Sequence, residues 1–499
     1  MRIATALTLA GASGVIAVQG WAPLAWWWLA MLAYAALFYL LRHTRTAVQA
    51  GLLGLVFGLA LQLFGHGWVL DALHRKSGMA LAPAALSSLI FAAYLALFSS
   101  LPCVIWRFIV KAAASKPPDI TLSSCAAFAS LMTLGEWGRS LPFNGFTSLS
   151  LGYALIDTWL AGYAPIAGVY GLGWLGYYFA ASLVLILTLR RAAPTLVLAA
   201  LLVSGVALLS VDWVQANGPP LKYRLLQSNV AQERKFDPSS RVRQMQRLVA
   251  SIEHQPADLI VTPETAFTVF FNELPSGILS RLQRFSQDNG SHLFLGIATL
   301  AANAEGHNSV LHLAPGASRI GQYDKVRLMP FGEYGPAGFG WFSAALAIPL
   351  KDLRPGNSDQ QAFRVGEQSI ATLICHEDLI GEDARRWLPA ATLFINPSNL
   401  AWFEGSAAIA QRLQVVRMRA MESGRPILRA TNTGITAQID QRGRVIRQLP
   451  EMQEGTLSGE VQAMQGLTPY ACFGDWPVVF GSLMFVLFCL ATKRMRGIP

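Results

Sequence analysis

The chain has 499 residues, of which 53% are hydrophobic and only 14% are charged. Soluble globular proteins carry roughly 25% charged residues, so this composition excludes a fully soluble protein and indicates one that lies at least partly in a membrane. The formal net charge of +10 does not indicate a nucleic-acid partner. Lysines and arginines beside membrane spans orient those spans, and no basic cluster here contains interleaved aromatic residues.

Apolar runs dominate the N-terminal part of the chain and return near its end. A hydrocarbon core about 30 Å thick requires about 20 apolar helical residues. The sequence therefore predicts a polytopic α-helical membrane domain with about eight spans, seven of them within residues 1–213 and the last within residues 474–492. The seven are expected near residues 3–19, 22–41, 49–69, 83–110, 121–138, 164–189 and 194–212.

The positions of lysine and arginine indicate how these spans are oriented. Alternate loops hold more of them, for example Arg42 and Arg45 after the second span and Lys493 after the last. Because positively charged loops stay in the cytoplasm, we expect both termini there. Seven spans then place residues 222–465 on the opposite side of the membrane, in the periplasm or outside the cell.

Residues 222–465 have an ordinary soluble composition and alternate between strand and helix patterns. "YRLLQSNV" and "DLIVTPE" predict strands on either side of an amphipathic helix, "PSSRVRQMQRLVASIEHQ", and "QSIATLIC" predicts a strand that ends at Cys375. This alternation predicts a layered α/β domain in which helices cover buried sheets. Functional residues of such domains gather at the carboxyl ends of strands.

Three predicted strands end on residues suited to nucleophilic chemistry: Glu264 in "LIVTPETAF", Lys325 in "YDKVRLMPFGEY" and Cys375 in "TLICHED". The thiolate is the reactive form of cysteine, and a free thiol with a pKa near ~8.5 is mostly protonated at neutral pH. A glutamate can accept the thiol proton, while a lysine favours the thiolate and neutralises a developing oxyanion. Backbone N–H groups after Cys375 could complete an oxyanion hole.

Each of these three residues also has a plainer structural interpretation. A lone thiol at a strand end is commonly a core residue, a "PE" after a strand often only caps a helix, and a loop lysine is usually solvated. From the residues alone both interpretations stay open.

No metal or disulfide framework is expected. The zinc motif HExxH needs a second histidine, which "HEDLI" after Cys375 lacks. The five cysteines form no CxxC pair and their number is odd, so neither a disulfide framework nor a zinc cluster is indicated.

The order Glu264, Lys325, Cys375, with "PE", "DK" and "CxE" around them, resembles the carbon–nitrogen hydrolase (nitrilase) superfamily, whose members use a Glu–Lys–Cys triad on an αββα sandwich. The membrane spans make the chain similar to the apolipoprotein N-acyltransferase branch. Further blocks that resemble this branch are "GWAPLAWWWLAML", "PFNGFTSLSLGY", "APIAGVYGLGWL", "AWFEGS" and "RMRAMESGRPILRATNTG". The resemblance implies a nitrilase-like catalytic domain over residues 222–465 and covers essentially the whole chain.

The resemblance also implies roles for individual residues. Cys375 would be the nucleophile, Glu264 the general base and Lys325 the cation that stabilises the oxyanion. Further supporting or substrate-binding residues would be Glu333, which orients the lysine and the acceptor amine, Glu377 and His376 beside the nucleophile, and the apolar Phe236, Trp341 and Trp402 near the acyl chain.

The activity that the resemblance implies is phospholipid-dependent acyl transfer, without a cofactor, in the bacterial inner membrane. A phospholipid, phosphatidylethanolamine in the family, would donate an acyl chain to Cys375, and the α-amine of a diacylglyceryl apolipoprotein would accept it. The catalytic domain would then face the periplasm. Rival interpretations are a membrane-tethered amidase or hydrolase, an N-acyltransferase for another amine, and a non-catalytic lipid or lipoprotein binding protein.

Four residues depart from the pattern of this family around the substrate gate. His376 stands where a tyrosine is usual, Leu400 where an aspartate is, Glu404 where a glycine is, and Arg412 where a histidine often is. These departures concern the head-group or acceptor preference more than the chemistry.

Overall fold

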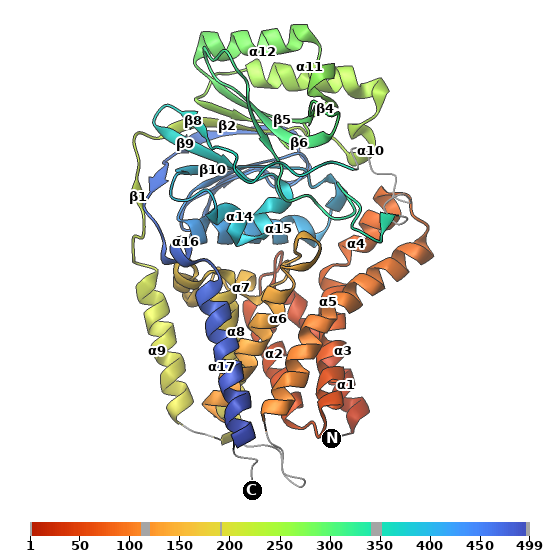
Figure 1. Ribbon diagram of the computed structural model, residues 1–499, viewed down its shortest axis with the longest axis vertical. Helices are drawn as coiled ribbons and strands as arrows, with labels where there is room; N and C mark the ends of the chain where they lie inside the picture. Colours follow the sequence, from red (N-terminus) through yellow and green to blue (C-terminus); the bar gives the residue numbers. More distant parts are fainter. Residues whose placement is uncertain (1, 111–119, 190–191, 341–351, 496–499) are drawn as a thin grey trace.

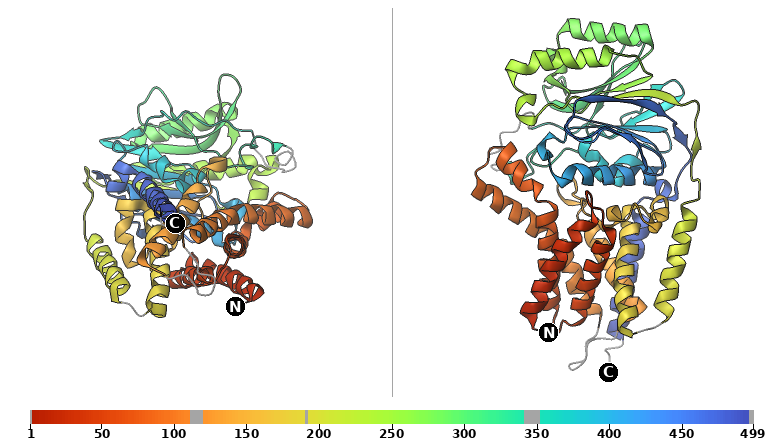
Figure 2. Two further views of the ribbon diagram at one scale, coloured as in Figure 1. Left: turned by 60° about the horizontal axis from the view of Figure 1, so that its bottom comes forward. Right: turned by 180° about the vertical axis from the view of Figure 1, so that it is seen from behind.

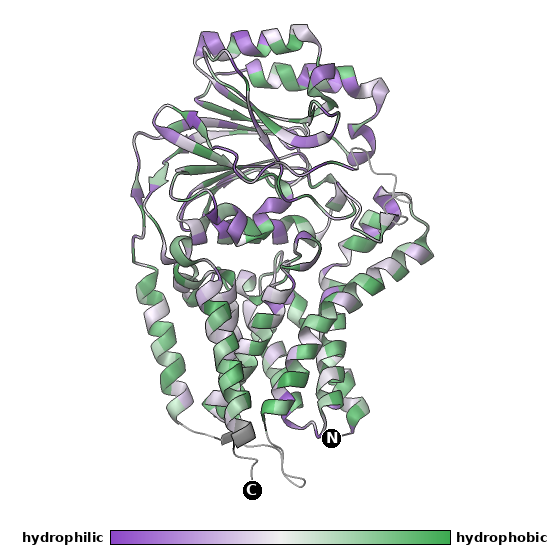
Figure 3. Ribbon diagram, in the orientation of Figure 1, coloured by the Kyte–Doolittle hydropathy of each residue, from purple (hydrophilic) through white to green (hydrophobic). Residues whose placement is uncertain are grey.

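The computed structural model describes residues 2–110, 120–189, 192–340 and 352–495, and it consists of a helical bundle with an α/β domain stacked on one end of it (Figure 1). Figure 3 shows that hydrophobic residues cover the bundle helices, whereas the α/β domain contains hydrophobic and hydrophilic residues. Trp341 lies outside the described residues.

A helix lies at each of the eight segments predicted to span a membrane. Four described helices are long and apolar enough to do so by length and composition: Ile3–Gly20, Ala47–Gly65, Leu81–Ile109 and Trp159–Thr188. The bundle helices are α1 (Ile3–Ala17), α2 (Trp27–Arg42), α3 (Ala47–Gly65), α5 (Leu81–Ile109), α6 (Leu122–Gly138), α8 (Ala164–Leu189), α9 (Ala192–Leu208) and α17 (Trp476–Met495).

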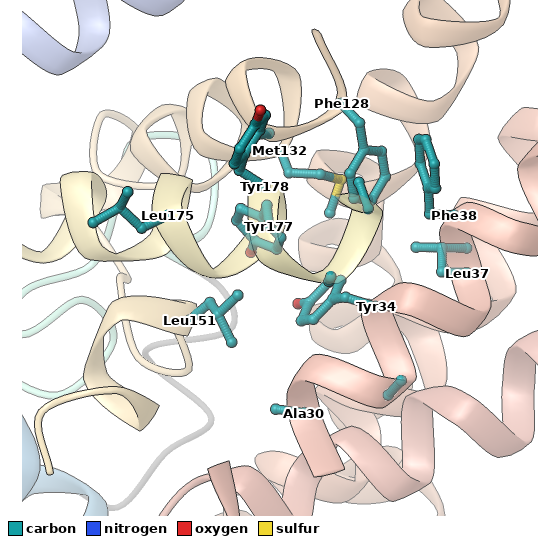
Figure 4. Close-up of a cluster of buried hydrophobic side chains, with 14 of the residues drawn as sticks. Ala30, Tyr34, Leu37, Phe38, Phe128, Met132, Leu151, Leu175, Tyr177 and Tyr178 are labelled. Atoms are coloured by element: carbon teal, nitrogen blue, oxygen red, sulfur yellow. The ribbon is translucent and has the colours of Figure 1, made fainter. Parts of the chain in front are cut away.

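Aromatic side chains and glycines hold the bundle together. Tyr34 and Tyr177 meet with ring centroids 4.8 Å apart, and Phe38 and Phe128 meet at 5.0 Å, so that α2, α6 and α8 share one buried cluster (Figure 4). A Cβ on Gly14 would lie 2.3 Å from the Phe57 carbonyl oxygen, so α1 packs directly on the backbone of α3. Such close helix contacts are typical of small residues in membrane bundles.

Short helices fill the junction between the bundle and the α/β domain. They are η1 (Val18–Gly20), α4 (Trp68–Asp71), η2 (Ala72–Lys76), η3 (Pro142–Asn144), α7 (Leu151–Ala154), η4 (Trp159–Tyr163) and α16 (Pro469–Phe473). Hydrogen bonds join this junction to the domain above, since the Thr147 hydroxyl donates to the Leu379 carbonyl at 2.8 Å and Asn144 Nδ2 to the Leu328 carbonyl at 3.0 Å.

Two sheets form the centre of the α/β domain. The seven-stranded sheet has the order β14-β2-β3-β5-β6-β7, with β4 paired to β5, and the six-stranded sheet has the order β13-β12-β11-β10-β9-β8. A separate pair joins β1 to β15. The strands are β1 (Gln215–Ala216), β2 (Leu221–Gln227), β3 (Leu259–Val261), β4 (Phe267–Phe270), β5 (His292–Leu300), β6 (Gly306–Leu313), β7 (Gly321–Asp324), β8 (Phe363–Val365), β9 (Gln368–Thr372), β10 (Leu393–Ser398), β11 (Ile427–Thr431), β12 (Ala437–Ile439), β13 (Val445–Gln448), β14 (Gly455–Val461) and β15 (Met464–Gln465).

Helices cover the outer face of each sheet. In Figure 1 and the rear view of Figure 2, α11 (Pro238–Glu253) and α12 (Ser276–Asn289) lie over the seven-stranded sheet, and α14 (Gly381–Arg385) and α15 (Ala407–Ser423) lie between the other sheet and the bundle. The remaining helices of the described residues are α10 (Gln232–Lys235), η5 (Phe271–Glu273), η6 (Cys375–Leu379) and η7 (Ala401–Phe403).

The alternating pattern of the strands explains this layering. Tyr223 and Leu225 of β2 point into the core between the two sheets, while Leu226 packs with the α11 residues Met245 and Leu248. Successive side chains of a strand point to opposite faces, so a sheet covered on both faces needs apolar residues at both sets of positions.

The strand predicted to end at Cys375 is shorter than expected. β9 ends at Thr372, and Cys375 instead begins the 3-10 helix η6. The Leu373 N–H still donates to the Ile395 carbonyl of β10 at 3.0 Å, whereas the Ile374 N–H donates to Oε2 of Glu377 at 2.6 Å.

Candidate active site

Strand directions bring the three candidate residues to one edge of the domain. β2, β3 and β5 run parallel, and β7 shares their direction because β6 is antiparallel to both β5 and β7. In the other sheet β9, β10 and β11 run parallel. Glu264 after β3, Lys325 directly after β7 and Cys375 after β9 therefore all follow the carboxyl ends of strands.

Lys325 holds two carboxylates together. Its ammonium lies 2.9 Å from Glu264 Oε1 and 2.9 Å from Glu333 Oε2. Asn308, at the neighbouring end of β6, donates to both glutamates, at 2.7 Å to Glu264 and 2.6 Å to Glu333. Lysine and glutamates thus form one buried cluster in which each carboxylate has a charged partner.

The second oxygen of Glu264 and its backbone are also held. Oε2 accepts the backbone N–H of Asn399, after β10, at 2.8 Å. The buried Lys235 of α10 donates to the Glu264 carbonyl at 3.0 Å and to the Thr265 hydroxyl at 2.7 Å. Thr265 has φ +46°, so Lys235 fixes a left-handed turn directly after the base.

These contacts keep the cluster charged in spite of its burial. Burial by itself would raise the pKa of the Glu264 carboxyl, but Lys325, Lys235 and Asn308 outweigh it and hold that pKa below its usual value. Burial would lower the pKa of the Lys325 ammonium, but the charges of Glu264 and Glu333 raise it. Lys235 has no carboxylate contact of this kind, and burial lowers its pKa to about 8.

Cys375 is partly buried and has φ +47°, a left-handed conformation that costs energy for a residue with a side chain. Burial, reinforced by the charge of Glu264 and opposed by Lys325 and Arg412, raises the pKa of its thiol to about 12. The charges of Glu264 and Lys325 thus both act on the Cys375 thiol. Within the described residues its sulfur has no hydrogen-bond partner.

Glu377 lies beneath the nucleophile, fully buried. Besides the Ile374 N–H, its carboxylate accepts the Tyr323 hydroxyl and the Val326 N–H, each at 2.8 Å. Glu377 therefore ties the turn of Cys375 to the segment that follows Lys325. Burial raises the pKa of this carboxyl to about 7.

His376 is also buried, and it bonds the backbone of Gly145 in the junction. Burial, together with the charges of Arg412 and Lys325, holds its pKa well below its usual value, so the imidazole is neutral. Its Nε2 has no partner within the described residues. No group of three or more His, Cys, Asp or Glu residues that could hold a metal ion is found in the described part of the chain.

The described aromatic candidates, Phe236 and Trp402, and two departures from the family pattern, Leu400 and Glu404, lie in segments that follow α10 and β10. Phe236 follows α10, and the Lys235 ammonium lies 5.8 Å from its ring centroid. Trp402 lies in η7, next to Phe403, whose ring packs 4.5 Å from Trp68 of the junction. Glu404 forms an ion pair with Lys76 at 2.8 Å, and Leu400 is buried against Gly434.

Sequence reasoning missed three polar residues that support the site: Asn308, Asn399 and Lys235. It named Arg412, beneath the turn of Cys375, only as a departure from the family pattern. Asn308 and Asn399 stand beside strand ends, which is a usable signal, since parallel strands end at a common edge. Lys235 lies in the short helix α10 and Arg412 in α15, where charged residues are ordinarily solvent-exposed, so their hydrogen bonds to the site could not be predicted from the sequence.

Two family models match the chain: the apolipoprotein N-acyltransferase N-terminal domain over residues 13–182, and carbon–nitrogen hydrolase over residues 222–470. An apolipoprotein N-acyltransferase of Ralstonia nicotianae is 37% identical over 99% of this chain and 95% of its own length. One of Nitrosomonas europaea is 38% identical over 97% and 95%. The chain belongs to the apolipoprotein N-acyltransferase family.

Among solved structures, a carbon–nitrogen hydrolase from Helicobacter pylori matches 49% of this chain and 89% of its own, with 16% identity and a TM-score of 0.37. The family match confirms the resemblance expected from the sequence and the carbon–nitrogen hydrolase fold of the α/β domain.

Proposed function

We propose that this acyltransferase moves a fatty acyl chain from a phospholipid to Cys375 and then to the α-amine of the S-diacylglyceryl cysteine of an apolipoprotein. Membership of the family supports lipoprotein N-acylation. The single observation that carries the residue assignment is the buried Glu264–Lys325–Glu333 cluster, in which the charges of Glu264 and Lys325 act on the Cys375 thiol.

In the first half-reaction Cys375 attacks the sn-1 ester of the phospholipid while Glu264 takes the thiol proton. Because the pKa of the thiol is raised and that of Glu264 is lowered, proton transfer at rest is unfavourable, and it therefore accompanies the attack. Lys325 and a backbone N–H stabilise the oxyanion. The intermediate then collapses, and the leaving lysophospholipid alkoxide takes the proton from Glu264.

In the second half-reaction the neutral α-amine of the acceptor attacks the thioester. Glu264 takes a proton from the attacking nitrogen, the C–S bond breaks, and the thiolate regains that proton. An amide and the free thiol result. Glu333, which also contacts Lys325, keeps the lysine in place through both steps and would orient the amine. Phe236, Trp402 and Trp341 would line the acyl chain.

The proposed architecture has eight spans, seven over residues 1–213 and one over residues 474–492, around an αββα sandwich over residues 222–465. The arrangement in Figure 1 supports it, because α1 begins and α17 ends at the end of the bundle far from the α/β domain. With the arginine-rich loops on the cytoplasmic side, both termini lie there and the catalytic domain lies in the periplasm of a bacterial inner membrane.

The test is acyl-enzyme formation by the purified full chain in detergent, with phosphatidylethanolamine labelled in its sn-1 chain. Wild-type protein is expected to take up label that hydroxylamine releases, and Cys375→Ala is expected to take up none. Addition of a diacylglyceryl peptide should move the label to the peptide. Absence of a hydroxylamine-sensitive adduct from wild type would refute the proposal, and transfer to water alone would show a hydrolase instead. Cys472→Ala, at an exposed cysteine, is the matched control.

A further inference from the structure

Helix α15 places a guanidinium directly against the turn that carries the nucleophile. Arg412 Nη2 donates to the backbone carbonyl of Cys375 at 2.9 Å, and Arg412 also forms an ion pair with Asp378 in the same turn. Arg412 is buried, with a relative exposure of 9%. One side chain thus holds both ends of the 3-10 helix η6.

The contact with the Cys375 carbonyl determines where the next N–H points. In a planar trans peptide the carbonyl and the following N–H point in opposite directions. Because the Cys375 carbonyl faces Arg412, the N–H of His376 faces away from α15. Within the described residues this N–H has no hydrogen-bond acceptor, so it is free to bind an oxygen atom of a substrate.

A buried ionic network fixes Arg412 in turn. Asp378 is fully buried and is shared between Arg412 and Arg429, whose Nη1 lies 3.0 Å from Asp378 Oδ2. Arg429 also donates to Asn396, and Asn396 Nδ2 donates to the Leu373 carbonyl at 2.6 Å, two residues before Cys375. The segment 373–378 is therefore held at three points from below.

We infer that Arg412 is a positioning residue for the acylation step: through the Cys375 carbonyl it aims the His376 N–H at the oxyanion. Two arginines that share one aspartate also leave a net positive charge beneath the sulfur. The left-handed φ of Cys375 needs such support, since an unsupported turn would relax and rotate the N–H away. This inference rests on the proposed function.

Acylation and alkylation of the Cys375 thiol distinguish a positioning role of Arg412 from a general structural role. Acylation by phospholipid passes through an oxyanion, whereas alkylation by iodoacetamide is a direct displacement at carbon that needs no oxyanion hole. Removal of an oxyanion donor typically costs about 10²–10³-fold in rate. For Arg412→Gln we therefore expect the acylation rate to fall at least about 30-fold, while the alkylation rate at the pH where the thiol is ionised stays within about threefold.

Two further measurements sharpen the test. The pH profile of alkylation should move to higher pH in Arg412→Gln, because a cation near the thiolate is lost. Arg412→Lys should recover part of the acylation rate, since an ammonium can still donate to the Cys375 carbonyl. Arg417→Gln on the same helix, which breaks the ion pair with Asp157 at the surface, is the matched control and should leave both reactions unchanged.

A parallel fall of both reactions in Arg412→Gln, or an acylation rate within threefold of wild type, overturns the inference. If Arg412→Gln does not fold, Arg412→Lys decides, because unchanged acylation relative to alkylation in that variant would also overturn it. Failure of the proposed function is distinguishable, since wild-type protein would then form no acyl adduct although its thiol still alkylates.

Discussion

Two buried glutamates in this molecule have pKa values shifted in opposite directions. Glu264 at the active site has donors on both carboxylate oxygens, from Lys325, Asn308 and the Asn399 N–H. Glu422 lies in α15 where that helix meets the bundle; its Oε1 accepts the Val169 N–H at 2.8 Å and Arg419 at 2.9 Å. Its Oε2 has no partner within the described residues.

The hydrogen-bond donors and cations around each carboxylate, and not its burial, determine its pKa. Both carboxylates are buried, with relative exposures of 6% for Glu264 and 1% for Glu422. Donors and two lysines hold the pKa of Glu264 below its usual value, whereas burial, only partly opposed by Arg419, raises the pKa of Glu422 to about 8. A base must be ionised to accept a proton, while a residue that joins two domains need not be.

The largest expected effect comes from removing the cation that Glu264 and Glu333 share. In Lys325→Met both carboxylates lose their charged partner, so they repel each other, the pKa of Glu264 rises and the oxyanion loses its stabiliser. We expect the rate of acyl-enzyme formation from labelled phospholipid to fall at least about 10³-fold. The exposed Lys222 gives the matched control Lys222→Met. A loss below tenfold would contradict the role of Lys325.

Next in size is the effect of Glu422 on stability. Its folded pKa, about 8, lies above an unfolded value near ~4.3, so the folded state binds more protons between these values. The contribution of Glu422 to stability is complete below about pH 4 and is lost as the pH rises to about 8. Glu422→Gln keeps the acceptor oxygen for Val169 and Arg419 but does not titrate.

Thermal inactivation in detergent at several pH values measures this effect. Relative to wild type, Glu422→Gln should gain on the order of 2–4 kcal/mol between pH 5 and pH 8. Glu253→Gln, at a surface ion pair with Arg281, should show no such trend. Curves for Glu422→Gln and wild type that stay parallel would show that Glu422 is ionised in the folded state.

The sequence indicated the three candidate catalytic residues more readily than the residues that support them. Glu264, Lys325 and Cys375 stand at strand ends with family motifs around them, so pattern alone places them at one edge. Asn308 and Arg412 reach this edge only through strand pairing and helix packing, which a sequence does not display. β14 escaped prediction for a similar reason: "GTLSGEV" has two glycines and little alternation, and it forms a strand because it pairs along the whole of β2.

The number of spans shows the same limit. Composition predicted the positions of eight bundle helices, but several are shorter than a bilayer requires by themselves, such as α2 and α9. The length of a membrane-spanning helix depends on its packing against neighbouring helices and on its flanking residues, as well as on hydropathy. The layered α/β class, in contrast, follows from strand and helix periods. The carbon–nitrogen hydrolase fold was implied by the family resemblance, and the family match confirms it.

A smaller change at the active site tests how donors set the pKa of Glu264. Asn308→Ala removes one amide that both Glu264 and Glu333 share, and a charge-assisted hydrogen bond contributes about 1.5–3 kcal/mol. Because the pKa of Glu264 starts below its usual value, its rise should lower the acylation rate mainly at acidic pH and change it little near neutral pH. The acidic limb of the pH–rate profile should therefore move to higher pH. Asn303→Ala, in the exposed turn before β6, should leave the profile in place, and an unmoved limb in Asn308→Ala would refute this account.

The smallest expected effect lies at Lys76, where the bundle touches two loops of the catalytic domain. Its ammonium lies 2.8 Å from Glu233 of α10 and 2.8 Å from Glu404 after η7. The first loop carries Lys235 and the second follows Asn399, and both of these residues hold Glu264. Glu233 is 53% exposed, so water replaces Lys76 there at little cost, but Glu404 is only 12% exposed and one of its oxygens is buried with no partner among the described residues.

The two carboxylates should therefore respond differently when Lys76 is lost. Lys76→Met should lower stability by about 1 kcal/mol, and Glu233→Gln should change it by less. In a double-mutant cycle Glu404→Gln should recover most of the loss in Lys76→Met, because the uncompensated charge on Glu404 is what costs energy there. Arg75→Met, next to Lys76 and in an exposed pair with Asp71, is the control. Equal coupling of Lys76 to Glu233 and Glu404 would show that burial does not decide the strength of this contact.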